Sequence, residues 1–160
     1  MYFKFSLIGL IIFLLPMPVN ILYMLLPPRD SVSQTTSPSK LLDFLEQGSR
    51  ILFAAALCFL QSGPVPTLNH WLFYFALAFL LLYMLTWLRY FTGGRKTALL
   101  GKPFLKLPIP LAIFPVLYYL CSAFWLKNYI ALGCILIFGI VHCFLTYQTF
   151  YKNAPSNAAS

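Results

Sequence analysis

Apolar residues lie in long blocks along this chain and do not alternate with polar ones. Five blocks can be drawn, at 5–26, 41–61, 68–91, 109–126 and 129–150. Each is close to the ~20 residues that cross about 30 Å of hydrocarbon as a helix. Helices are expected because a segment in lipid must satisfy its own backbone hydrogen bonds. The pattern predicts an all-α, polytopic transmembrane bundle formed by residues 1–152 as a single domain, with a disordered tail at 153–160.

The second block is the least apolar of the five. Its uninterrupted apolar part is only 51–60, and it crosses a membrane only if Asp43, Glu46 and Arg50 enter with it. If it does not cross, the chain has four spans and an interfacial helix. A helix cap at Ser37 with Pro38 in the first turn favours one long helix. Side-chain pairs at i,i+4, Asp43–Gln47 and Glu46–Arg50, favour it too.

Prolines and polar residues between the blocks predict helix boundaries. Pro16 should interrupt the first helix, and Pro18 with it, because a proline removes a backbone donor. Thr67 is the expected cap of the third helix, and Pro110 suits the first turn of the fourth. Pro115 lies deeper in that fourth helix and should bend it.

Composition excludes an ordinary soluble domain. The chain is 61% hydrophobic and 9% charged, whereas soluble domains carry about 25% charged residues. The net charge of +8 does not indicate nucleic-acid binding, because no basic helix or aromatic stacking platform lies outside the apolar blocks. We expect membrane lipids as partners instead, with the positive charges near anionic headgroups.

The distribution of Lys and Arg predicts the orientation. With five spans, nine of the eleven basic residues lie on one side, and Lys4 and Lys127 lie on the other. With four spans the division is seven against four. The sharper division favours five spans, with the N-terminus outside and the C-terminus in the cytosol. The predicted location is a multi-pass protein of a plasma membrane.

Polar residues within the blocks form the candidate site. Asn20, Arg50 and His142 are each expected about 9–13 Å deep in the cytosolic half, counting 1.5 Å per residue. Glu46 is shallower, and Arg89 stands where the third helix leaves the membrane. One interpretation is a cytosol-facing pocket that binds a ligand, in which Glu46 orients Arg50. The other is structural, with the same groups joining helices and with Glu46 neutralising Arg50.

The connection after the third block is strongly basic. Arg95, Lys96, Lys102 and Lys106 follow one another with no acidic residue among them. They are expected to determine topology and to contact anionic lipid headgroups.

No constellation for catalysis stands out in the sequence. There is no paired nucleophile and base, and no His, Cys or carboxylate spacing that predicts a metal site or a cofactor. The expected function is that of a non-enzymatic accessory or interaction protein, with a homo-oligomer or a protein partner possible. The alternative is a small transporter or a lipid- or anion-binding protein that uses the cytosol-facing pocket.

Short motifs spread over most of the chain carry a resemblance. They are Leu15-Pro16-x-Pro18-x-Asn20, Pro27-Pro28, Leu45-Glu46 with Gly48, Arg89-Tyr90 with Gly94-Arg95, Lys102-Pro103, Pro108-Ile109-Pro110, Phe114-Pro115-Val116, Trp125-x-Lys127 and Gly139-Ile140-x-His142. Together they resemble a group of small, uncharacterised integral membrane proteins of bacteria. The resemblance implies a compact bundle in a bacterial plasma membrane. It implies no activity and no catalytic residue.

Overall fold

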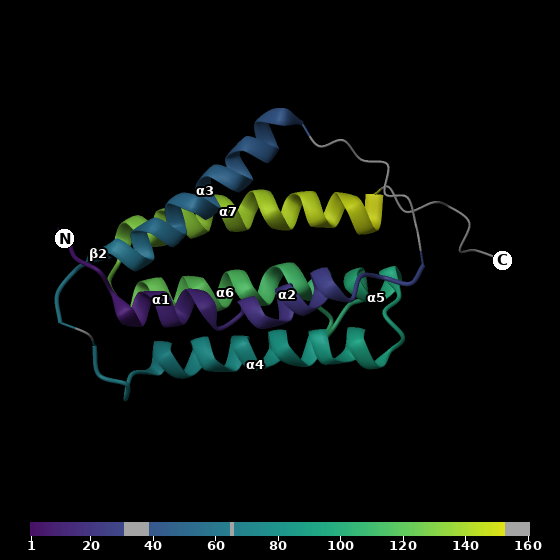
Figure 1. Cartoon of the computed structure of the whole chain (residues 1–160), viewed down its shortest axis with the longest axis horizontal. Coiled ribbons are helices and arrows are strands. Elements are labelled where there is room, and N and C mark those ends of the chain that lie inside the picture. Colours follow the sequence, from purple (N-terminus) through teal and green to yellow (C-terminus); the bar gives the residue numbers. More distant parts are fainter. Residues whose placement is uncertain (31–38, 65, 153–160) are drawn as a thin grey trace.

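The computed structural model describes residues 1–30, 39–64 and 66–152. The chain is mostly helical (Figure 1), with two short strands, and its elements are β1 (Tyr2–Phe3), α1 (Leu7–Leu14), α2 (Met17–Leu25), α3 (Lys40–Phe59), β2 (Leu60–Gln61), α4 (Trp71–Thr92), α5 (Thr97–Gly101), α6 (Pro110–Trp125), α7 (Tyr129–Tyr147) and the π-helical turn η1 (Gln148–Lys152). The expected cap at Ser37, with Pro38, and the expected disordered tail both lie outside the described residues.

Three helical stretches are long and apolar enough to cross a membrane. They are Leu7–Leu25, which combines α1 and α2, then Trp71–Thr92 and Tyr129–Tyr151. Helix α6 is equally apolar but shorter. Helix α3 has the length of a span, yet Lys40, Asp43 and Glu46 make its first half polar. The chain is therefore a helical protein with at least three membrane-compatible helices among its described residues.

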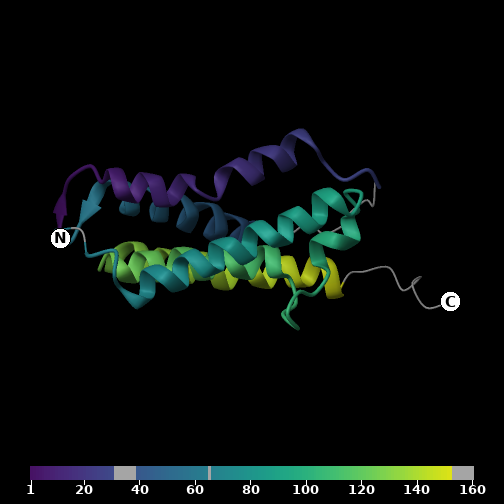
Figure 2. The ribbon, with the colours of Figure 1, turned by 90° about the horizontal axis from the view of Figure 1, so that it is seen from below.

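The helices lie side by side along one long axis (Figure 1). Helix α6 packs against both α4 and α7, and α7 packs in turn against α3. Helix α1 contacts α3, while the N-terminal half of α3 diverges from α7 and from the rest of the bundle. Seen from below, α1 and α2 lie above the layer that α4, α6 and α7 form (Figure 2). This arrangement surrounds an interior space in the half of the bundle that contains α2.

The break between α1 and α2 is confirmed at Pro16. Proline has no N–H, so the carbonyl of Ile12 loses its normal helical partner. The hydroxyl of Tyr118 donates to that carbonyl at 2.8 Å, and Tyr119 donates to the carbonyl of Phe13 at 2.9 Å. Two tyrosines of α6 thus satisfy the carbonyls exposed by the break, as a lipid environment requires.

Glycines allow two close helix contacts. A Cβ on Gly9 would lie 2.0 Å from the carbonyl oxygen of Leu57, so α1 and α3 touch through their backbones. A Cβ on Gly139 would lie 2.5 Å from Val116 Cγ1, where α7 meets α6. Small residues at membrane helix contacts permit this approach.

Hydrogen bonds fasten the end of the bundle that carries the N-terminus. Strand β1 pairs antiparallel with β2, and Tyr2 lies opposite Gln61. Asn128 caps α7 by accepting from the N–H of Ala131, and its amide donates to the carbonyls of Ala56 and Leu60. The C-terminal end of α3 is therefore tied both to the N-terminus and to the start of α7.

The predicted start of one helix is confirmed, and the predicted cap of another is wrong. Helix α6 begins at Pro110, as predicted, after Ile109 in a left-handed conformation with φ of 45°. The predicted cap at Thr67 is wrong. Helix α4 begins at Trp71, and the side chain of His70 accepts from the N–H of Leu72. An imidazole nitrogen here replaces the expected hydroxyl.

The tyrosine bonds to the α1–α2 break generate a stability prediction. Tyr118→Phe should cost about 1 kcal/mol, because it leaves the Ile12 carbonyl unsatisfied. Pro16→Ala restores an N–H beneath that carbonyl, so Tyr118→Phe should cost clearly less in the Pro16→Ala background. Denaturant unfolding of the four proteins in a double-mutant cycle measures the difference. If Tyr118→Phe lowers the free energy of unfolding equally in both backgrounds, Tyr118 does not compensate for the missing N–H of Pro16. Tyr74→Phe, which removes an exposed bond to Asn69, is the control.

Candidate functional site

A pocket of about 590 Å³ lies between the helices of the bundle and is open on one side. Helices α1, α2, α3, α4, α5, α6 and α7, with η1, all contribute to its wall, which is mainly aromatic and aliphatic. Phe13, Tyr119, Ile135 and Phe138 are among the apolar residues that line it. Its volume falls within the range of about 300–1,000 Å³ typical of small-molecule sites.

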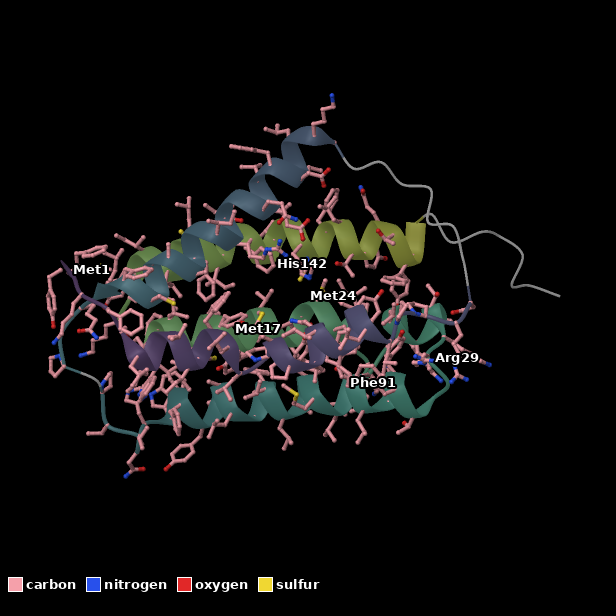
Figure 3. The ribbon with its side chains drawn as sticks, viewed as in Figure 1. Met1, Met17, Met24, Arg29, Phe91 and His142 are labelled. Carbon is pink, nitrogen blue, oxygen red and sulfur yellow. The ribbon has the colours of Figure 1, made fainter. Side chains whose placement is uncertain are left out.

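Three of the predicted site residues share this wall. Asn20 on α2, Arg50 on α3 and His142 on α7 all line the cavity, although they are far apart in the sequence. Asn20 accepts a hydrogen bond of 2.6 Å from the hydroxyl of Tyr83 on α4, which fixes its position. In Figure 3, His142 and Met17 lie in the space between α7 and α2.

The predicted pairings within α3 are wrong. Glu46 does not pair with Arg50: its carboxylate Oε1 lies 2.7 Å from Nδ1 of His142 on α7. Arg50 instead donates to the side-chain oxygen of Gln47. No side-chain hydrogen bond joins Asp43 to Gln47 among the described residues. Helix α7 packs along α3, so it offers Glu46 a partner on a neighbouring helix that the sequence spacing alone does not reveal.

The Glu46–His142 pair leaves Arg50 with a neutral partner. Arg50 is the one Lys or Arg side chain among the described residues that line the cavity. The pair contributes either no net charge, when His142 is protonated, or one negative charge when it is neutral. Arg50 is exposed, and its guanidinium is the one Lys or Arg charge on the described wall, which is mainly apolar but also includes Asn20, His142 and Thr146.

One face of α7, continued by η1, supplies part of the wall. Ile135, Phe138, His142 and Thr146 recur every three or four residues, which places them on one face of α7. They extend for about 17 Å at 1.5 Å per residue, and Phe150 follows in η1. The ring of Phe138 stacks on His142 with centroids 4.9 Å apart, which orients the imidazole beside Glu46.

Arg89 does not belong to this group. Its guanidinium donates to the carbonyls of Lys102 and Pro103, at 2.6 and 2.9 Å, and lies 5.5 Å from the ring centre of Phe104. It is absent from the cavity wall. The prediction that Arg89 joins the pocket is corrected, because the α5–α6 connection folds back and supplies the carbonyls that Arg89 binds.

That connection needs an internal support. Leu105, Lys106 and Ile109 all have positive φ angles, of 50°, 64° and 45°, which cost energy for residues other than glycine. The bonds from Arg89 to the preceding carbonyls offset part of that cost. Arg89 is a structural residue that holds the basic connection in place.

The basic residues of the connection lie at one end of the bundle. Lys96, Lys102 and Lys106 are exposed there, and the Arg95 carbonyl accepts from the N–H of Arg29 at 3.0 Å. Exposure is compatible with the expected contact with lipid headgroups, which stays a prediction.

Asp30 anchors the start of α5. Its carboxylate accepts from the backbone N–H of Thr97 at 2.7 Å and from the Thr97 hydroxyl at 3.0 Å. The backbone N–H of Thr97 is the largest influence that holds the pKa of Asp30 below its usual value. The segment after α2 is thereby joined to the basic connection.

Sequence reasoning missed two cavity residues on α4. Tyr83 and Trp87 lie one turn apart and both line the cavity. Trp87 is 6% exposed, and its indole Nε1 has no hydrogen-bond partner among the described residues. In an apolar block such aromatic residues are indistinguishable from core residues, so only the fold identifies them as part of the cavity wall.

Comparison with known protein families, with curated proteins and with solved structures finds no match for this chain. Within residues 1–30, 39–64 and 66–152, no group of three or more His, Cys, Asp or Glu side chains could hold a metal ion. The chemistry of the cavity is therefore the basis for the functional argument.

The Asp30 contact predicts a pH dependence. A lowered pKa means that the folded form favours the ionised carboxylate of Asp30. The Asp30–Thr97 contact therefore contributes its full stability above about pH 4. That contribution is lost as the pH falls through the lowered pKa. Hydrogen exchange at Thr97 should accelerate at that low pH, relative to the intrinsic rate. In Asp30→Asn, protection of Thr97 should be weaker at neutral pH and should change little on acidification. Unchanged protection in the variant at neutral pH would contradict this role.

Proposed function

We propose that this protein binds an anionic amphiphile inside the bilayer, in the cavity between its helices. The observation that carries the proposal is the positive charge of Arg50 on a mainly apolar wall. A cation beside a membrane interior is stabilised by an anion. Glu46 bonds to His142 and not to Arg50, so a bound ligand would supply the anion in direct contact with Arg50.

The remaining wall supports an apolar body on the same ligand. Phe13, Ile135 and Phe138 offer nothing that would hold a small inorganic anion, but they would cover hydrocarbon well. Asn20 adds a polar side chain to the same wall. These features favour the lipid- or anion-binding alternative over an accessory role, and they nominate no catalytic group.

We propose further that the chain crosses the membrane five times, with α3 as the second span. Lys4 lies beside the end of α3, since its N–H donates to the Phe59 carbonyl at 3.0 Å. The basic connection lies at the opposite end, beside Arg29. The positive-inside rule then puts the connection and the C-terminus in the cytosol and the N-terminus outside. The cavity would lie in the cytosolic half of a bacterial plasma membrane.

Removal of the Arg50 charge tests the proposed function. The amount of an anionic amphiphile that co-purifies with the wild type should be about 10- to 100-fold lower in Arg50→Gln. This is the loss expected when one charged hydrogen-bonding group is removed. Mass spectrometry of extracts from the purified protein measures the amount. Lys40→Gln is the matched control, because it removes an equal charge from the same helix at an exposed position outside the cavity. Equal lipid contents in both variants and the wild type would refute the proposal.

The topology can be tested at the connection between β2 and α4. Gly63 is replaced by Cys in a background without the four native cysteines, and intact cells are treated with a membrane-impermeant maleimide. Five spans predict labelling from outside. Protection in intact cells, with labelling only after the membrane is opened, would mean that α3 does not cross.

A further inference from the structure

The contact between α3 and α7 has a polar pair at its outer end. Ser49 and Phe53 of α3 are buried, whereas five of the six residues at 40–45 are exposed. Between these two parts the side chain of Glu46 is 16% exposed, and its carboxylate Oε1 lies 2.7 Å from Nδ1 of His142 on α7. Towards its N-terminus α3 then diverges from α7 (Figure 1). Among the described residues, this pair is the one side-chain hydrogen bond between α3 and α7.

Two features weaken α3 just after Glu46. Gly48 has no side chain to restrict its backbone, and a Cβ there would meet nothing within 4 Å. The hydroxyl of Ser49 donates to the carbonyls of Leu45 and Glu46, at 2.5 and 3.2 Å. Such bonds compete with the backbone N–H groups of the helix and favour bending. Gly48 and Ser49 therefore form a weak point between the diverging half of α3 and the half that packs in the bundle.

The strength of the Glu46–His142 pair depends on one proton. A histidine side chain gains or loses its proton between about pH 5 and 8. When His142 is protonated, the pair joins two opposite charges, and a partly buried ion pair is screened less than an exposed one. When His142 is neutral, the carboxylate of Glu46 has an uncharged partner, and the hydrogen bond is weaker.

The groups around His142 titrate outside that range. Arg50 of α3 stays protonated and donates to Gln47. The other titratable side chains that share the cavity wall with His142, or follow it in α7, are Tyr23, Tyr83, Tyr119 and Cys143. Tyrosine and cysteine side chains lose their protons at about pH 10 and 8.5 in water. The other histidine of the chain, His70, caps α4.

We propose that the Glu46–His142 pair is a proton-controlled latch. With His142 protonated, the latch holds the polar first half of α3 against α7. Loss of the proton weakens the latch, and residues 40–47 then move away from α7 about the weak point at Gly48 and Ser49. The latch requires no ligand in the cavity, so this inference stands apart from the proposed function.

A distance across the diverging gap tests the latch. Spin labels are placed on cysteines at Leu41 of α3 and Tyr147 of α7, both exposed, in the full chain without its four native cysteines. Double electron–electron resonance of the protein in nanodiscs gives the distance distribution at about pH 5 and about pH 8. The matched control pair is Leu52 with Tyr147, because Leu52 is an exposed residue of α3 beyond the weak point.

The expected result is a pH-dependent distribution for the Leu41–Tyr147 pair alone. The ratio of near to far distances should fall about 5- to 10-fold from pH 5 to pH 8, as the pair loses one of its two charges. His142→Gln should give the pH 8 distribution at both pH values. His142→Lys, which keeps a positive charge throughout, should give the near distance at both. Gly48→Ala should narrow the distribution at pH 8, because it stiffens the helix without a steric clash.

Three results would overturn the proposal. The wild-type distribution might be the same at both pH values, which would mean that the proton does not control α3. A pH dependence that persists in His142→Gln and disappears in His70→Asn would assign the effect to the other histidine. An equal change in the Leu52–Tyr147 pair would mean that α3 moves as a whole and that Gly48 and Ser49 are not its hinge.

Discussion

The structure depends on how the α1–α2 break satisfies its backbone. Pro16 removes a donor in the middle of a membrane-compatible stretch, and lipid offers no water to replace it. Tyr118 and Tyr119 of α6 supply the missing donors through their hydroxyls. This contact holds α1 against the centre of the bundle while α2 continues in a new direction. Because α3 packs on α1 and α7 and diverges further along, space remains beside α2.

The cavity is a consequence of that geometry, and its chemistry comes from three helices. Packing of α7 along α3 draws Glu46 away from Arg50, its neighbour on the same helix, and towards His142. An acid that could have neutralised the arginine is thus used elsewhere. The result is a cation on a mainly apolar wall, an arrangement that an anionic amphiphile would complete. Asn20, held by Tyr83, lines the same cavity.

Much of the fold follows from the sequence because the blocks of apolar residues are long. Their limits agree with α4, α6 and α7 within a few residues, and the effect of Pro16 follows from its missing N–H. The candidate site was only partly predictable. Asn20, Arg50 and His142 stand out as polar residues in apolar blocks, but sequence spacing suggested Glu46–Arg50 where the fold makes Glu46–His142. Arg89 was grouped wrongly, since no sequence pattern indicated that the basic connection folds back onto it. Trp87 resembles any core aromatic, and only the fold identifies it as part of the cavity wall.

The central claim is that the guanidinium of Arg50 contacts the anionic group of a ligand in the cavity. A high-resolution structure of the protein extracted from its membrane in lipid nanodiscs tests this most directly. We predict ligand density in the cavity between α7 and α2, with one end in contact with the Arg50 guanidinium. A cavity filled by neighbouring side chains, with Arg50 turned to the aqueous boundary, would contradict the account.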